Sequence, residues 1–251
     1  MMKPGELQRH ITQTYINLRV GIAIMGFAFP IILWIGGRMF AGDQLQASMS
    51  DYYHTRMRDV FVGILIAIGS FLYLYRGFSK GENIALNLAG IFAAGVALLP
   101  NAAFDSTVER MDIFSLTPIA PHTHHLHVVC AVSFFLSIAY VCMFRAKDSL
   151  RLIDDDTVAA RYRRIYTFFG ILMVVAPAIV AGLAYFHQQI LENKTNVVFF
   201  VEAGAVWVFS AYWLVKTCEF SRYPERVEIT LIKEGRYPWD CEKESGDQSE
   251  P

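Results

Sequence analysis

The chain has few charges and few cysteines for its length of 251 residues. Asp, Glu, Lys and Arg together make up 18% of it, and the formal net charge is -1. A surface that binds nucleic acid needs Lys and Arg clustered on one face, so no nucleic acid is expected among the partners. The four cysteines, at positions 130, 142, 218 and 241, form no CxxC pair and lack the spacing of a secreted disulfide framework. Neither a redox motif nor a disulfide scaffold is therefore indicated.

Apolar sequence is what the chain has in abundance. Hydrophobic residues make up 54% of it, and the mean hydropathy is +0.34. Polar, Gly-, Pro- or charge-bearing connections separate six apolar runs, and about twenty helical residues suffice to cross a hydrocarbon layer of roughly 30 Å. The sequence therefore predicts an all-α polytopic membrane protein with six transmembrane helices, at residues 20–39, 60–75, 84–99, 127–144, 165–186 and 197–215.

Polar sequence flanks this membrane domain at both ends. Residues 1–19 have apolar residues at spacings of three and four, which predicts an N-terminal interfacial segment. Residues 20–218 form the predicted six-helix transmembrane domain, and residues 219–251 predict a cytoplasmic C-terminal tail that is partly disordered. Short loops with excess Lys and Arg stay in the cytoplasm, and the connection between the fourth and fifth spans carries six of these residues. Both termini are therefore expected to be cytoplasmic.

This orientation gathers polar residues near the non-cytoplasmic surface. Six of the seven histidines fall there, together with the polar stretch 50–59, the segment 105–127 and Glu202. Glu202 lies about one and a half turns into the sixth span among apolar neighbours, so its carboxylate needs an imidazole or a bound cation as a partner. Polar groups at membrane depth are costly, and they therefore indicate a functional site.

The stretch 50–59 offers one half of such a site. Ser50 and His54 are four residues apart, so they share a helix face if the second helix starts early. A hydroxyl or carboxylate, such as that of Asp51, can then fix the imidazole tautomer while the other ring nitrogen binds a metal. Asp59 joins the site only if the helix begins near Thr55. The alternative interpretation is a polar helix entry with solvated or paired interface charges.

The segment 121–127, PHTHHLH, offers the other half. His124 and His127 are three residues apart and can chelate one cation from a helical turn, as can His122 and His125, and neutral imidazole suits zinc and related ions. The HExxH signature is absent. The alternative is a His-rich loop with one structural histidine at the start of the helix. His127 is deepest toward the apolar run, so it is the preferred ligand.

The segment 50–63, which contains YYHTRMRDVFVG, resembles a family of six-span bacterial membrane proteins that has no settled activity. The resemblance continues through residues 87–90 and 95–100 and resumes at His127, at Glu202 and at residues 213–216. It implies an integral protein of the bacterial inner membrane.

A looser resemblance is to the superfamily of membrane hydrolases that includes the alkaline ceramidases and the adiponectin-receptor-like proteins. Those proteins hold zinc and a water inside a seven-helix bundle by a Ser-x-x-x-His step, an Asp and a His-x-x-x-His pair. Ser50 and His54 match the first of these elements in spacing. The chain differs in having six predicted spans and no His-x-x-x-His pair. The resemblance implies zinc and lipid-amide hydrolysis, and only the Ser-x-x-x-His spacing supports this implication.

These residues predict a metal-dependent hydrolase that acts on a lipid amide or ester from the outer leaflet. His54, His127 and either His124 or Glu202 would hold zinc or another divalent metal, which lowers the pKa of a bound water toward neutrality.

The hydrolase hypothesis also assigns catalytic roles to Asp59, Glu202 and Ser50. Asp59 or Glu202 would act as general base, and Ser50 would stabilise the developing oxyanion. The competing hypothesis is a non-enzymatic membrane sensor, transporter or scaffold built on the same polar residues. Membrane lipid is the expected partner.

Overall fold

The computed structural model describes residues 4–41, 44–99, 123–152, 155–190 and 196–222, and this part of the chain contains helices and no strand. The prediction of an all-α chain is therefore confirmed for the described residues. Asp105 and the rest of the segment 100–122, and the tail beyond Arg222, lie outside them. The long helices are α1 (Pro4–Gly36), α2 (Arg58–Leu74), α3 (Lys80–Leu98), α4 (Thr123–Tyr140), α5 (Asp156–Ile190) and α6 (Val197–Arg222).

Four short helical segments join or extend the long helices. The π-helices η1 (Gly37–Ala41) and η3 (Val141–Arg145) continue α1 and α4. The 3-10 helices η2 (Ser50–His54) and η4 (Ser149–Leu152) precede α2 and α5.

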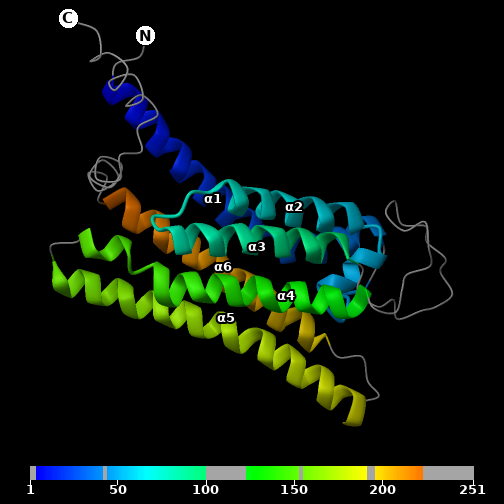
Figure 1. Ribbon diagram of the computed structural model, residues 1–251. Coiled ribbons are helices and arrows are strands. Elements are labelled where there is room, and N and C mark those ends of the chain that lie inside the picture. The colour runs from blue at the N-terminus through cyan, green and yellow to red at the C-terminus, as the bar shows by residue number, and fades with distance from the viewer. Residues whose placement is uncertain (1–3, 42–43, 100–122, 153–154, 191–195, 223–251) are drawn as a thin grey trace, which may run out of the picture.

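The six long helices form a closed ring. Each helix packs against the next along the chain, and contacts between α1 and α6 close the circle. Figure 1 shows the helices running side by side, with the start of α1 and the end of α6 at the same end of the bundle. The opposite end gathers the start of α2, the end of α3 and the starts of α4 and α6. Because successive helices run in opposite directions and their number is even, α6 ends at the same end of the bundle at which α1 starts.

Among the described residues, five helices are long and apolar enough to cross a membrane. The qualifying stretches are Thr12–Phe40, Lys80–Leu98, His125–Arg145, Asp156–Leu183 and Val197–Arg222. Large apolar side chains point outward from them, where hydrocarbon would surround the bundle. These helices confirm an integral membrane protein and five of the six predicted spans, whereas α2 has only 17 residues.

Two predicted boundaries do not coincide with breaks in the helices. The predicted interfacial segment at residues 1–19 and the first predicted span are parts of one helix, because α1 runs without interruption from Pro4 to Gly36. The predicted start of the tail at residue 219 falls inside α6, where Glu219 is buried. The apolar runs indicate the membrane-embedded part of each helix, and the hydrogen-bonded backbone continues past them.

Local sequence explains where two of the helices begin. The Ser79 hydroxyl accepts a hydrogen bond from the Glu82 backbone N–H at 3.3 Å, which caps α3. Asp155 precedes α5, and its Oδ1 accepts hydrogen bonds from the Thr157 hydroxyl at 2.6 Å and from the backbone N–H groups of Thr157 and Val158. These hydrogen bonds lower the pKa of the exposed Asp155 carboxyl, and the bond from the Thr157 hydroxyl has the largest effect.

Glycines set the close approach of α2 and α3. A Cβ on Gly69 would lie 2.7 Å from the Gly90 carbonyl oxygen, and a Cβ on Gly90 would lie 2.5 Å from that of Gly69. Small residues at such crossings allow helix backbones to pack directly in membranes.

A Gly69→Ala substitution is therefore expected to lower the free energy of unfolding by about 1–3 kcal/mol, because it overpacks this crossing. The matched control is Gly63→Ala in the same helix, where an added Cβ would meet nothing within 4 Å. Thermal unfolding in detergent measures both variants. Equal melting temperatures for the two would contradict the close packing.

Candidate polar site at the end of the bundle

The segment before η2 is fixed by reciprocal hydrogen bonds. The Ser48 backbone N–H donates to Asp51 Oδ2 at 3.0 Å, and the Asp51 backbone N–H donates to Ser48 Oγ at 3.2 Å. The hydroxyls of Ser48 and Ser50 lie 3.0 Å apart within hydrogen-bonding distance. Both serines are buried. This short turn therefore holds the Ser50 side chain in a defined position.

The same segment is attached to the start of α6. The Phe199 backbone N–H donates to the Ala47 carbonyl oxygen at 2.9 Å, which satisfies one of the N–H groups that a helix start leaves open. The Met49 backbone N–H donates to Glu202 Oε2 at 2.6 Å. The half-buried Glu202 carboxylate is thus anchored by the chain 153 residues before it.

His127 is held by the end of α3. Its side chain is 5% exposed, and Nδ1 lies 2.8 Å from the Leu99 carbonyl oxygen. A carbonyl oxygen only accepts hydrogen bonds, so Nδ1 carries the proton in this contact. In the neutral imidazole Nε2 is then the nitrogen that carries the lone pair.

Ser50, His127 and Glu202 line one cavity of about 100 Å³. They come from η2, α4 and α6, and they are the polar side chains of a lining that is otherwise apolar. Its aromatic part consists of Phe29, Phe61, Phe134 and Phe135. The structure thus brings together three of the six predicted site residues, at the end of the bundle where α2, α4 and α6 begin.

His54 and Asp59 do not line this cavity. The half-buried His54 ring lies edge-on to the Tyr53 ring, with centroids 5.3 Å apart. Arg58 donates to the Tyr53 hydroxyl at 2.8 Å and lies over the same ring. Asp59 is exposed in the first turn of α2, which begins at Arg58, three residues after Thr55.

The predicted metal ligands are only partly placed. His124 lies in the first turn of α4, but its side chain is outside the described residues. Among the side chains that are described, no three of His, Cys, Asp or Glu gather in a position to hold an ion. The expected ligands were His54, His127 and either His124 or Glu202, and of these His127 and Glu202 line the same cavity.

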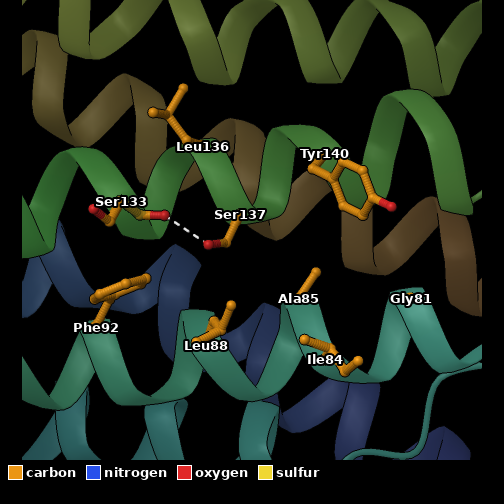
Figure 2. A pocket seen from close by; sticks show the side chains of 9 residues that line it. All are labelled: Gly81, Ile84, Ala85, Leu88, Phe92, Ser133, Leu136, Ser137 and Tyr140. Carbon is orange, nitrogen blue, oxygen red and sulfur yellow. Dashed lines mark hydrogen bonds between the residues drawn. The ribbon is translucent and has the colours of Figure 1, made fainter.

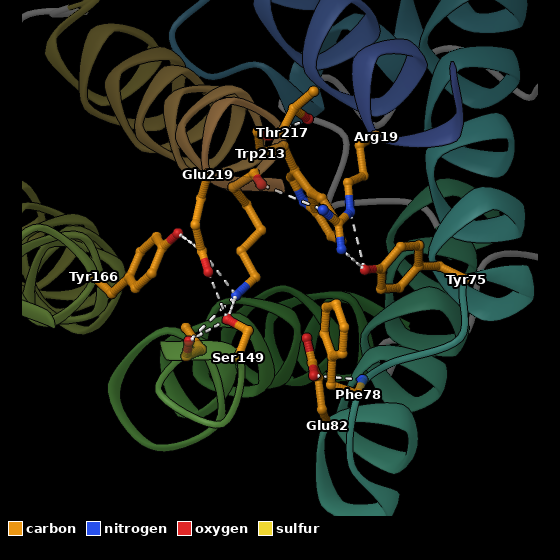
Figure 3. A network of polar contacts seen from close by, with 11 residues as sticks. Arg19, Tyr75, Phe78, Glu82, Ser149, Tyr166, Trp213, Thr217 and Glu219 are labelled. Atoms are coloured by element: carbon orange, nitrogen blue, oxygen red, sulfur yellow. Dashed lines mark hydrogen bonds and ion pairs between the residues drawn. The ribbon is translucent and has the colours of Figure 1, made fainter. Parts of the chain in front are cut away.

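A second buried polar cluster lies at the opposite end of the bundle, and sequence reasoning missed it (Figure 3). Lys216 Nζ donates to Ser149 Oγ at 2.5 Å, to the Ala146 carbonyl oxygen at 3.2 Å and to Glu219 Oε2 at 3.2 Å. The Tyr166 hydroxyl donates to the same Glu219 oxygen. The only sequence signal was the spacing of three residues between Lys216 and Glu219, which helices commonly use for ion pairs.

Arg19 and Glu82 extend this cluster toward α1 and α3. Arg19 is fully buried, donates to the Tyr75 hydroxyl through Nε at 3.0 Å, and donates to the Lys216 carbonyl oxygen at 3.3 Å. Glu82 is 2% exposed and accepts a hydrogen bond from the Phe78 backbone N–H at 2.8 Å. Two buried cations therefore face two buried carboxylates.

We refer to Arg19, Glu82, Lys216 and Glu219, with their hydrogen-bonding partners, as the charged cluster. Within it Lys216 donates to Ser149 and forms an ion pair with Glu219. The cluster connects α1, α3, α5, η4 and α6, and its formal charges cancel. Its evident role is to hold the helices together.

Fold and site together define an integral membrane protein that is helical throughout its described part, with a small, mostly apolar cavity that three polar side chains line at one end of the helix bundle. No family model matches the chain, and neither a curated protein nor a solved structure matches it.

Proposed function

We propose that the protein is a six-span membrane hydrolase that cleaves a lipid ester or amide at the non-cytoplasmic end of its bundle. In this proposal α2 also crosses the membrane, which brings the number of spans to six. Its 17 helical residues extend about 25 Å, and the bilayer can thin locally around a short helix. Exposed basic residues at the other end of the bundle, among them Arg76, Lys80, Arg161 and Arg163, favour a cytoplasmic location for that end.

The observation that carries the proposal is the convergence of Ser50, His127 and Glu202 on one cavity. Buried polar groups in a mostly apolar cavity are typical of binding sites and active sites. The Leu99 carbonyl fixes the His127 tautomer, and the Met49 N–H orients the Glu202 carboxylate. Both are therefore positioned rather than freely rotating side chains.

These residues support a hydrolysis in which water is the nucleophile. His127 Nε2 or the Glu202 carboxylate accepts a proton from water as its oxygen attacks the carbonyl carbon. The Ser50 hydroxyl donates a hydrogen bond to the oxygen on which negative charge develops. The carbon–oxygen or carbon–nitrogen bond then breaks, and the proton passes to the leaving alcohol or amine.

The size of the cavity limits what enters it. At about 100 Å³ it is smaller than the 300–1,000 Å³ that drug-sized ligands occupy. It fits the carbonyl group of a lipid and a few neighbouring atoms, while the acyl chains remain in the bilayer. The same small volume favours a second candidate function, a non-enzymatic sensor whose cavity holds a small ligand.

We expect His127→Ala and Glu202→Gln to reduce turnover of long-chain esters and amides by about 10²- to 10⁴-fold, because each removes a candidate base. The measurement is product release by the full chain in lipid vesicles. His10→Ala is the matched control, because this histidine is exposed on α1 at the other end of the bundle, and it should leave turnover unchanged.

Elemental analysis and chelation of the same preparations test the predicted metal. About one zinc per chain that is lost in His127→Ala, together with turnover that chelation abolishes, would support a metal-dependent reaction. Turnover that survives chelation would support the metal-free route. If no substrate is turned over while a ligand still raises the melting temperature, the hydrolase proposal fails in favour of the sensor.

A further inference from the structure

A groove of about 500 Å³ runs along the outer face of the bundle between α3 and α4 (Figure 2). Its walls carry Ile84, Leu88 and Phe92 from α3 and Leu136 from α4. Ile84 is 59% exposed and Leu136 is 48% exposed. Both helices are long and apolar enough to span a membrane, so the groove opens toward the hydrocarbon of the bilayer.

The lining of the groove includes no charged side chain. Its serine hydroxyls are those of Ser133 and Ser137, and Ser137 Oγ donates to the Ser133 carbonyl oxygen at 2.7 Å. A serine that bonds back to its own helix presents little polarity to its surroundings. The occupant of this stretch is therefore expected to be an apolar chain.

A cation lies at one end of the groove. Arg145, in η3, donates from Nε to the hydroxyl of Tyr140 at 3.0 Å. Its guanidinium covers the first turn of α3, where a Cβ on Gly81 would lie 2.8 Å from Nε. Gly81 and Tyr140 both line the groove, so the guanidinium is continuous with it. Tyr and Arg are typical of the level at which lipid headgroups lie.

The length of the groove matches one leaflet. Gly81 and Phe92 line its two ends on α3, and eleven residues of helical rise correspond to about 16 Å. Half of a hydrocarbon core of roughly 30 Å is about 15 Å. A lipid whose headgroup lies at Arg145 would thus place its acyl chain along the groove as far as the bilayer midplane.

We propose that this groove binds one anionic phospholipid of the leaflet on the Arg145 side, with an acyl chain between α3 and α4 and the phosphate against the guanidinium. Arg145 also forms an ion pair with Asp148, whose Oδ2 lies 3.5 Å from its Nη1. This carboxylate competes with a phosphate for the same cation. The site is separate from the cavity of Ser50, His127 and Glu202, and it does not depend on the proposed hydrolase activity.

Native mass spectrometry of the full chain, titrated with phosphatidylglycerol or with phosphatidylcholine of the same acyl chains, tests the proposal. Phosphatidylglycerol should bind more tightly, and Arg145→Gln should weaken its binding about fivefold, with a smaller effect on phosphatidylcholine, whose choline partly neutralises its phosphate. Arg161→Gln is the control, since this arginine is exposed on α5. Equal binding of the two lipids, or an Arg145→Gln variant that binds like the unaltered chain, would overturn the proposal.

Two further variants keep the test decisive if Arg145→Gln does not fold. Asp148→Asn should tighten the binding of phosphatidylglycerol, because it removes the competing carboxylate. Leu88→Trp should weaken the binding of both lipids by filling the groove. If Leu88→Trp instead converts an oligomer into a monomer and leaves lipid binding unchanged, the groove is an interface between copies of the chain and the proposal is wrong.

Discussion

Replacing Lys216 by Met is expected to lower the free energy of unfolding by about 3–5 kcal/mol, because it leaves a buried carboxylate without its cation. Lys216 is 2% exposed and Glu219 is 3% exposed, and Nζ lies 3.2 Å from Glu219 Oε2. Met keeps the length and most of the volume of the lysine side chain, so the loss of charge and donors dominates. Thermal unfolding in detergent should show a decrease of roughly 10 °C.

A second substitution separates the loss of the ion pair from a simple packing defect. In the double variant Lys216→Met with Glu219→Gln no uncompensated charge remains, and the Tyr166 hydroxyl can still donate to the amide oxygen. The double variant should therefore be more stable than Lys216→Met alone. Lys80→Met, at an exposed lysine, is the control and should change stability by less than about 0.5 kcal/mol. Additive losses in the double variant would contradict the ion-pair explanation.

The apolar runs of the sequence predicted the helices well, because the length of a membrane span is a local property of the chain. The predicted span at 60–75 corresponds to α2 at Arg58–Leu74, and the predicted start at residue 197 coincides with the start of α6. The ends were less predictable, because polar residues continue a helix beyond the apolar run wherever their side chains find partners. Glu219, in the last turns of α6, is such a residue.

Two predicted residues that share the cavity were recognisable from their apolar surroundings. Glu202 lies among apolar residues, and His127 is the histidine nearest to the apolar run, so both predictions rested on the cost of burying a polar group. Ser50 also lines the cavity, although the spacing that suggested it does not apply. Ser50 and His54 belong to a 3-10 helix, and the extended backbone of Thr55 separates that helix from α2. The rule that residues four apart share a face of an α-helix therefore fails here.

The charged cluster was not predictable from the sequence, because it depends on contacts between distant helices. Arg19 and Lys216 stand at the ends of apolar runs, where basic residues usually reach water and determine orientation. In the structure both are buried inside the bundle. Neither residue therefore counts as a loop charge, and the assignment of the cytoplasmic side depends on the exposed basic residues alone. A pattern confined to one span contains no information on whether a carboxylate of another span lies nearby.

Arg19→Leu should be the second most destabilising substitution, with an expected loss of about 3 kcal/mol or more. It leaves the Tyr75 hydroxyl without its donor and removes a hydrogen bond to the Lys216 carbonyl oxygen. It also removes a cation that lies 4.5 Å from the centre of the Phe220 ring and interacts electrostatically with Glu82. Arg19→Lys keeps the charge but not the planar fork of donors, so it should lose less than Arg19→Leu.

A double-mutant cycle with Tyr75→Phe tests whether the contact between Arg19 and Tyr75 carries this loss. Tyr75 is 1% exposed and receives hydrogen bonds from both Nε and Nη2 of Arg19. Tyr75→Phe alone should cost about 1–2 kcal/mol, because it leaves buried guanidinium donors unsatisfied. In the Arg19→Leu background the same change should cost little, since those donors are already gone. Arg161→Leu, at an exposed arginine of α5, supplies the control. If the two losses add without coupling, Arg19 stabilises the bundle through the aromatic rings and Glu82 rather than through Tyr75.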